Sequence, residues 1–169
     1  MSEDDEIPPD AFLPVPGGGH DFGVIDEATA KAVGCEAGPI CLQQGYPTEK
    51  GFGKLHIASH RQRMKQILGL GYRTVEAFVY DVAQNYTIIQ DAGDGRLSLV
   101  YKRLGRDLRI VVTKILRSGK PYWNVVTGLP YREARRPVLH EIKRSDGSEP
   151  TSNVAKRSRF ATLSLPKKT

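Results

Sequence analysis

The chain has 169 residues, of which 39% are hydrophobic, enough to bury the core of one domain with irregular ends. No apolar run approaches the ~18 residues that cross a bilayer, and the acidic start Met1–Glu6 lacks the pattern of a conventional signal peptide, which argues against a membrane protein and against ordinary secretion. The net charge of +6 combines −8 in residues 1–50 with +14 in residues 51–169, and a basic body of this kind attracts polyanions.

The first half of the sequence predicts helices after an irregular start. Residues 1–20 combine acids, prolines and a triple glycine, so we expect a disordered tail there. Two short elements follow, a helix over Asp26–Val33 and a strand over Pro39–Gln43. Apolar residues at the helical period predict one helix over Lys54–Leu68 and a second over Thr74–Asn85, which begins with a threonine N-cap.

The second half changes to the period of strands. Four apolar segments are separated by short turns rich in glycine and aspartate, which predicts an antiparallel meander. The order of the elements predicts an α+β fold in which two helices pack on one face of a four-stranded antiparallel meander. The expected strands are Tyr86–Ile89, Arg96–Arg103, Leu108–Ile115 and Tyr122–Thr127.

Composition also predicts the domain boundaries. We expect one folded domain over residues 21–145, followed by a basic tail over residues 146–169 in which Phe160–Leu165 is the candidate strand. Cys35 and Cys41 have no further ligand-type partner near them in sequence, which excludes a zinc site made of cysteines alone. We expect two reduced thiols, and a disulfide between them stays open.

Two of the four histidines, His56 and His60, lie four residues apart in the first long predicted helix, so helix geometry places them on one face a turn apart. Imidazoles take and give protons near neutral pH, and Arg61 and Arg63 would bring positive charge close to a phosphate. The alternative is that one histidine packs against the sheet while the other is solvated. A zinc-protease helix is disfavoured because Ile57 occupies the position of its catalytic glutamate.

Basic side chains gather on the second and third predicted strands and at their ends. Since alternate residues of a strand share a face, Arg109 and Lys114 are expected on opposite faces, and one of the two faces would form a cationic cleft. Solvated strand faces without a partner are the alternative. The cations concerned are Lys102, Arg103, Arg109, Lys114 and Arg117.

The last predicted strand holds the single tryptophan. Strand alternation places Trp123 and Thr127 on one face and Tyr122 on the other. Trp123 is better explained as a core residue than as a platform for a base. Thr127, at the end of the strand, either aims its hydroxyl at a cleft or serves as a simple turn residue.

The stretch from Gly38 to Arg132 resembles the phage-associated branch of the barnase–EndoU–colicin–RelE (BECR) nuclease superfamily. The resemblance is carried by Gly38–Gln43, by the Gly-x-x-His-Ile-x-x-His-Arg pattern of Gly53–Arg61, by a helix that ends near Asn85, and by the aromatic strand Tyr122–Thr127. It implies helices on a four-stranded antiparallel sheet. It also implies a domain found in phage head-associated proteins and in toxins used between bacteria, many of which cut RNA.

The resemblance further implies a metal-independent ribonuclease without a cofactor. The ribose 2′-hydroxyl would attack its own 3′ phosphate and leave a cyclic phosphate and a 5′-hydroxyl end, which requires a base, an acid and cations. His60 is the first choice for base or acid and His56 the second. Thr127 would hydrogen-bond the phosphate, and Lys114, like Lys102 and Arg109, would stabilise the charge that develops on it. The residues expected to bind substrate are Arg61, Arg63, Lys102, Arg103, Arg109 and Tyr122.

Two other functions compete with a nuclease. A non-catalytic nucleic-acid-binding module would use the same basic face, whereas an ADP-ribosyltransferase toxin would need a glutamate pair for which Glu133 and Glu141 are the only late candidates. The expected partners of a nuclease are RNA, either tRNA or another class, and a cognate acidic inhibitor, with no membrane. The expected location is the cytoplasm of the producing or target bacterial cell, reached by a secretion system or a phage particle.

Overall fold

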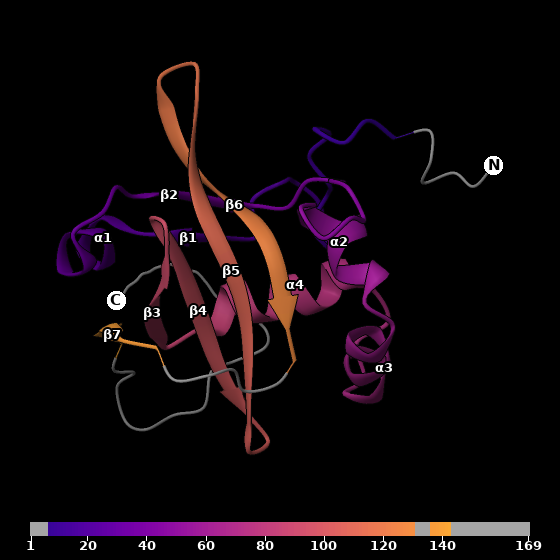
Figure 1. The fold of residues 1–169 in the computed structure, drawn as a ribbon. Coiled ribbons are helices and arrows are strands. Elements are labelled where there is room, and N and C mark those ends of the chain that lie inside the picture. The colour runs from indigo at the N-terminus through magenta and orange to yellow at the C-terminus, as the bar shows by residue number, and fades with distance from the viewer. Residues whose placement is uncertain (1–6, 131–135, 143–169) are drawn as a thin grey trace.

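The structure, a computed structural model, describes residues 7–130 and 136–142 and has an α+β fold, which confirms the predicted class. Within these residues the sheet is mixed and has seven strands in the order β1-β2-β6-β5-β4-β3-β7, and four helices accompany it (Figure 1). The predicted arrangement of two helices on four strands is therefore not the one observed. The strands are β1 (Gly23–Ile25), β2 (Gly38–Cys41), β3 (Ile88–Gly93), β4 (Arg96–Arg103), β5 (Arg106–Arg117), β6 (Lys120–Leu129) and β7 (Val138–Glu141).

Strands β3 to β6 pair one after the other in antiparallel fashion. Each of their three turns places two successive residues in the left-handed region, namely Asp94–Gly95, Leu104–Gly105 and Ser118–Gly119. This is the conformation of a type I′ turn, whose twist matches that of the strands it joins. The glycine in each turn was the sequence signal that predicted it.

The sheet extends beyond these four strands at both edges. At one edge β2 runs parallel to β6, with Ile40 opposite Trp123, and β1 pairs antiparallel with β2. At the other edge β7 pairs antiparallel with β3. The strands β1 and β7 have three and four residues, too few for an alternating pattern to show in the sequence.

Helices α1 (Glu27–Val33) and α4 (Val75–Asn85) lie where the sequence predicts them. The Asp26 carboxylate caps α1 by accepting a hydrogen bond from the Thr29 amide, and the Thr74 hydroxyl caps α4 by accepting one from the Ala77 amide at 3.0 Å. Both caps satisfy amide groups that a helix leaves unpaired in its first turn.

The single helix predicted over Lys54–Leu68 is instead two, α2 (Gly53–Ser59) and α3 (Arg61–Gly69). The chain leaves helical geometry at His60, where φ is −88° and ψ is 95°. The last turn of α2 closes locally, because Ser59 Oγ donates to the His56 carbonyl and the His60 amide donates to the Ile57 carbonyl. A break of one residue leaves the apolar period almost unchanged, so the sequence gives no sign of it.

The core lies between the helices and one face of the sheet, which we call the core face. Helix α4 crosses behind the sheet in Figure 1, and α2 and α3 lie beside the end of β6. Trp123 is 2% exposed and its indole nitrogen donates to the Glu36 carbonyl, which confirms the prediction that it is a core residue. The core-face residues of β4, β5 and β6 are Leu97, Leu99, Tyr101, Leu108, Ile110, Val112, Trp123 and Val125.

Part of the range expected to be a tail belongs to the fold. Leu13 is buried in the core and its amide donates to the Leu42 carbonyl at 2.8 Å, and Phe12 forms a bridge with Gln43. The candidate strand Phe160–Leu165, the boundary at residue 145 and Glu133 lie outside the described residues. Within the described ranges, none of the helices has the length and apolarity of a membrane span.

Candidate functional site

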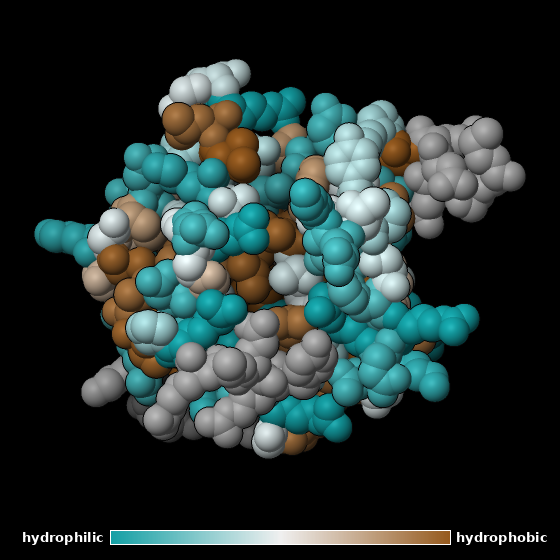
Figure 2. Space-filling view, viewed as in Figure 1, coloured by the Kyte–Doolittle hydropathy of each residue, from teal (hydrophilic) through white to brown (hydrophobic). Residues whose placement is uncertain are grey.

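The sheet carries a second row of side chains on the face opposite the core, which we call the second face. Gln90, Ser98, Val111 and Thr127 lie directly opposite one another across β3, β4, β5 and β6. Figures 1 and 2 view this face, and Figure 2 shows apolar side chains at the bottom of a hollow near its middle with hydrophilic side chains around it. In this row Gln90 and Thr127 are partly exposed, whereas Ser98 and Val111 are only 0% and 8% exposed.

A β-bulge decides which face Thr127 occupies. In the pairing of β5 with β6, Val111 lies opposite Thr127 and Val112 opposite Val125, so Val126 is an extra residue. Beyond a bulge the alternation of side chains reverses. Thr127 therefore lies on the second face, and the prediction that it shares a face with Trp123 is wrong.

The two histidines are in contact although they do not share one helix. Their ring centroids are 5.0 Å apart and the rings meet edge to face at 86°. His56 is 8% exposed, and its Nδ1 lies 2.9 Å from the Thr48 carbonyl. Because a carbonyl oxygen only accepts, the geometry places a proton on Nδ1 of His56.

His60 is half-buried and is biased toward its neutral form. Its pKa lies below the ordinary value, because burial disfavours the charged ring and because Arg63 and His56 add to that effect. An imidazole that is neutral at pH 7 can accept a proton. His60 therefore has the electronic state that a general base needs.

Arg63 joins this helix pair to the second face of the sheet. Its Nη1 donates to Thr127 Oγ1 at 2.8 Å. Its Nε is buried and has no hydrogen-bond partner among the residues that the structure describes. We call His56, His60, Arg63 and Thr127 the histidine site. An open hollow of about 570 Å³ lies beside it, lined by Ser59, His60, Arg61, Gln62, Arg63 and Gln66.

The other cations predicted to bind substrate divide between the two faces. Arg109 lies on the second face, 2% exposed, where its Nη1 donates to Gln90 and its Nη2 is 3.8 Å from Asp107. Lys102 also lies on that face, 3.9 Å from Asp107. No contact joins either of them to the histidines among the residues that the structure describes. They form a separate polar group farther along the sheet.

Lys114 and Arg103 lie on the core side of their strands. Lys114 is 3.5 Å from Glu36. Arg103 donates to the Tyr72 hydroxyl and stacks on its ring at 5.2 Å, in a network that fixes the segment before α4. The structure does not bring either residue to the histidines, because strand alternation directs them away from Thr127.

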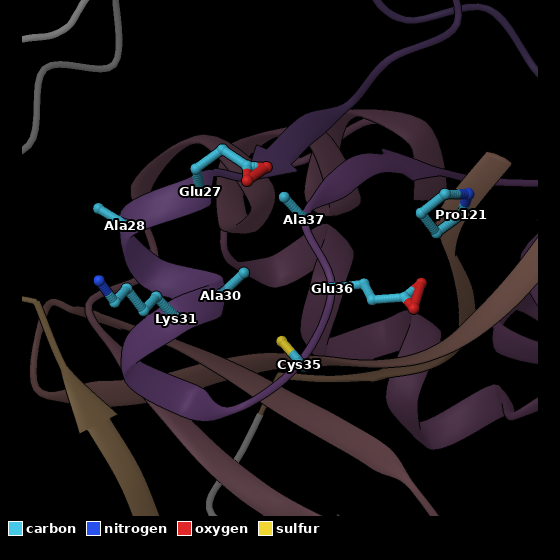
Figure 3. Close-up of a pocket in the computed structure, with 8 residues that line it drawn as sticks. All are labelled: Glu27, Ala28, Ala30, Lys31, Cys35, Glu36, Ala37 and Pro121. Atoms are coloured by element: carbon cyan, nitrogen blue, oxygen red, sulfur yellow. The ribbon is translucent and has the colours of Figure 1, made fainter.

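A larger open hollow lies elsewhere, beside α1 (Figure 3). Its volume is about 650 Å³, and Glu27 and Glu36 outnumber Lys31, whose side chain extends away from Cys35. The net negative charge of these lining residues does not suit the binding of a polyanion. The lining residues are Glu27, Ala28, Ala30, Lys31, Cys35, Glu36, Ala37 and Pro121.

Cys35 and Cys41 are free thiols, as expected. Burial raises the pKa of Cys41 to about 11 and also raises that of Cys35. Both thiols are therefore poor nucleophiles at neutral pH.

Two glycines place His56, of which the sequence pattern before the paired histidines includes Gly53 but not Gly45. Gly45 and Gly53 have φ values of +74° and +77°, and a Cβ on Gly53 would lie 2.4 Å from the Gln43 carbonyl oxygen. The amide groups that follow, of Lys54 and Leu55, donate to the Gln43 and Gln44 carbonyls. The glycine before the paired histidines was the available signal for this close approach.

Comparison of the chain with protein-family models, with curated proteins and with solved structures finds no match in any of the three. Among the described residues, histidine, cysteine, aspartate and glutamate side chains form no group of three or more that could hold a metal ion.

Proposed function

We propose that this chain is a metal-independent ribonuclease and that the histidine site is its active site. The observation that carries the proposal is the half-buried His60, whose pKa is lowered, beside the guanidinium of Arg63 at the edge of an open hollow. A neutral imidazole can serve as the base in the cleavage of a phosphodiester by an internal hydroxyl, and an adjacent fixed cation stabilises the charge that develops on the phosphate, while water supplies the proton of the leaving oxygen.

In this mechanism His60 takes the proton of the ribose 2′-hydroxyl as the oxygen attacks phosphorus. The bond from phosphorus to the 5′ oxygen breaks, the leaving oxygen takes a proton from water, and His60 then releases its own proton to water. Arg63 stabilises the negative charge that develops on the phosphate oxygens, and Thr127 holds the guanidinium in place. His56 positions His60 through its edge-to-face contact, and its own orientation is fixed by Thr48.

The test is cleavage of total RNA in EDTA by the purified protein, followed by mapping of the RNA ends. We expect cyclic phosphate and 5′-hydroxyl ends, and a loss of at least about 100-fold in rate for His60→Ala. His20→Ala is the matched control, because His20 is exposed and its ring is hydrogen-bonded to the Leu13 carbonyl, with no tie to the histidine site among the described residues. Equal rates for the two variants would remove the assignment of His60.

A binding module without catalysis is the second candidate. The burial of His56 favours it, because only one ring of the pair is left half-exposed. RNA binding that weakens with salt, with no cleavage in EDTA, would support this function instead.

A role as a toxin or phage-delivered effector in the bacterial cytoplasm extends the nuclease proposal. Such a protein needs an inhibitor where it is made, and an acidic protein would complement the +14 charge of residues 51–169. Expression of the parent chain should then arrest growth of a bacterial host, whereas His60→Ala should not. Equal growth of the two strains would contradict this role.

A further inference from the structure

Two aromatic rings and a guanidinium meet on the second face, away from the histidine site. The rings of Phe12 and Tyr122 are 5.4 Å apart and meet at 70°, and the guanidinium carbon of Arg117 lies 4.8 Å from the centroid of the Phe12 ring. We call these three residues the ring platform. Phe12 comes from the N-terminal segment, so the sequence pattern of the strands alone does not predict this cluster.

The ring platform lies on the part of the sheet that projects farthest. Beyond Val112, β5 pairs with β6 but not with β4, and the two strands continue as a hairpin to the turn at Ser118 (Figure 1, top). Arg117 lies on the second face, since β5 alternates from Arg109 without a bulge. Tyr122 shares this face because it precedes the bulge of β6.

The distance to the histidine site suits one continuous strand of nucleic acid. Tyr122 and Thr127 lie on the same strand and the same face, five residues apart, which corresponds to roughly 16 Å. A strand whose phosphate lies at His60 and Arg63 would therefore reach the ring platform within a few nucleotides.

The charge at the tip of the hairpin favours an anionic partner. Arg117 and Lys120 lie directly opposite each other across the two strands, an arrangement of like charges that destabilises a sheet. Within the described part of the chain, neither forms an ion pair with a carboxylate. A phosphate between them would relieve this repulsion.

We propose that the ring platform stacks an unpaired base of the RNA strand that the histidine site cleaves, so that the substrate is single-stranded RNA. This inference rests on the proposed function, because it names the substrate class of that site. Aromatic rings and arginine planes stack on bases that are splayed out of a duplex, whereas a paired base keeps its faces inside the helix. Arg117 and Lys120 would hold the neighbouring phosphates.

The test measures binding without cleavage. A fluorescent 2′-O-methyl oligonucleotide, which has no attacking hydroxyl, is titrated with the parent protein and with Tyr122→Leu, and fluorescence anisotropy gives Kd. We expect Kd to rise about tenfold for Tyr122→Leu. We also expect the parent protein to bind the single strand at least tenfold more tightly than the same sequence in a duplex.

Arg117→Gln keeps the proposal testable if Tyr122→Leu unfolds, because the Arg117 side chain is exposed and forms no part of the core. We expect it to raise Kd severalfold, whereas the control Arg73→Gln, also exposed but on the segment before α4, should change Kd little. Unchanged binding by Tyr122→Leu and Arg117→Gln, or equal affinity for strand and duplex, would overturn the platform. This experiment measures binding and not cleavage. Its outcome can therefore be distinguished from a failure of the proposed nuclease activity.

Discussion

The protonation state of His60 decides how the proposed activity responds to pH. Its pKa is lowered by burial first and by the Arg63 charge second, so the imidazole is the base form at pH 7. We predict that kcat/KM for RNA rises with pH through a midpoint below about 6.5 and then levels off. Arg63→Gln should move this midpoint upward, because the cation no longer disfavours the protonated ring. A midpoint above 7 in the parent protein would contradict the assignment.

The same shift links His60 to stability. The folded protein binds a proton at His60 less readily than the unfolded chain does, so the unfolded state gains protons as pH falls below about 6.5. The free energy of unfolding should therefore decrease from pH 7 to pH 5, and the decrease should be smaller in His60→Asn. Urea denaturation at both pH values measures the difference, and equal decreases in the two proteins would argue against it.

Leu104 occupies a backbone conformation that its side chain disfavours. It has φ +51° in the turn between β4 and β5 and is 79% exposed, so the side chain gains little from burial. Asparagine accepts the left-handed region more readily than leucine does. Leu104→Asn should raise the free energy of unfolding by about 0.5–1 kcal/mol, measured by thermal denaturation, without changing RNA cleavage. A lower melting temperature would count against this explanation.

Part of the candidate site could be predicted residue by residue. The pairing of His56 with His60 followed from their spacing, because the break at His60 still leaves the rings in contact. The position of Thr127 did not, since one extra residue in β6 reverses the alternation beyond it. Phe12 could not be predicted at all, because its neighbours in space lie far away in the sequence.

At the scale of elements, the entry into α2 sets the position of the histidine site. Gly53→Ala would require a left-handed alanine and would bring its Cβ against the Gln43 carbonyl. We predict a loss of more than about 2 kcal/mol in the free energy of unfolding, together with reduced RNA cleavage. Gly69→Ala is the matched control: a Cβ there meets nothing within 4 Å, so it should leave RNA cleavage unchanged and raise the free energy of unfolding by up to about 1 kcal/mol, because alanine favours a helix more than glycine does. Equal effects of the two substitutions would contradict this account.

Elements with local signals could be predicted, and those that depend on distant partners could not. The caps of α1 and α4 are encoded by Asp26 and Thr74 within one turn of each helix. In contrast, β1 and β7 exist because longer strands offer them an edge to pair with. Hydrophobic periodicity reveals a helix or strand long enough to have one apolar face. It does not reveal a short strand that forms only because a neighbouring strand offers it hydrogen bonds.

At the scale of the whole molecule, the uneven charge predicts how strongly salt acts on RNA binding. If Arg61, Arg63, Arg117 and Lys120 each neutralise one phosphate, the logarithm of the affinity should fall with the logarithm of salt concentration with a slope of about −3 for a single strand. Titrations from 50 to 300 mM KCl would measure it. A slope near zero would show that cations contribute little to binding.

The parallel pairing of β2 with β6 attaches the N-terminal third of the fold to the meander, and Trp123 lies at that pairing, opposite Ile40. Since it is the single tryptophan of the chain, fluorescence excited where the seven tyrosines do not absorb reports on the surroundings of Trp123 at this junction. If the pairing of β2 with β6 is lost before the meander unfolds, the fluorescence emission should shift to the red before the far-ultraviolet circular dichroism signal is lost. Comparing the two signals in one denaturation experiment would therefore show whether the two parts of the chain unfold as one cooperative unit.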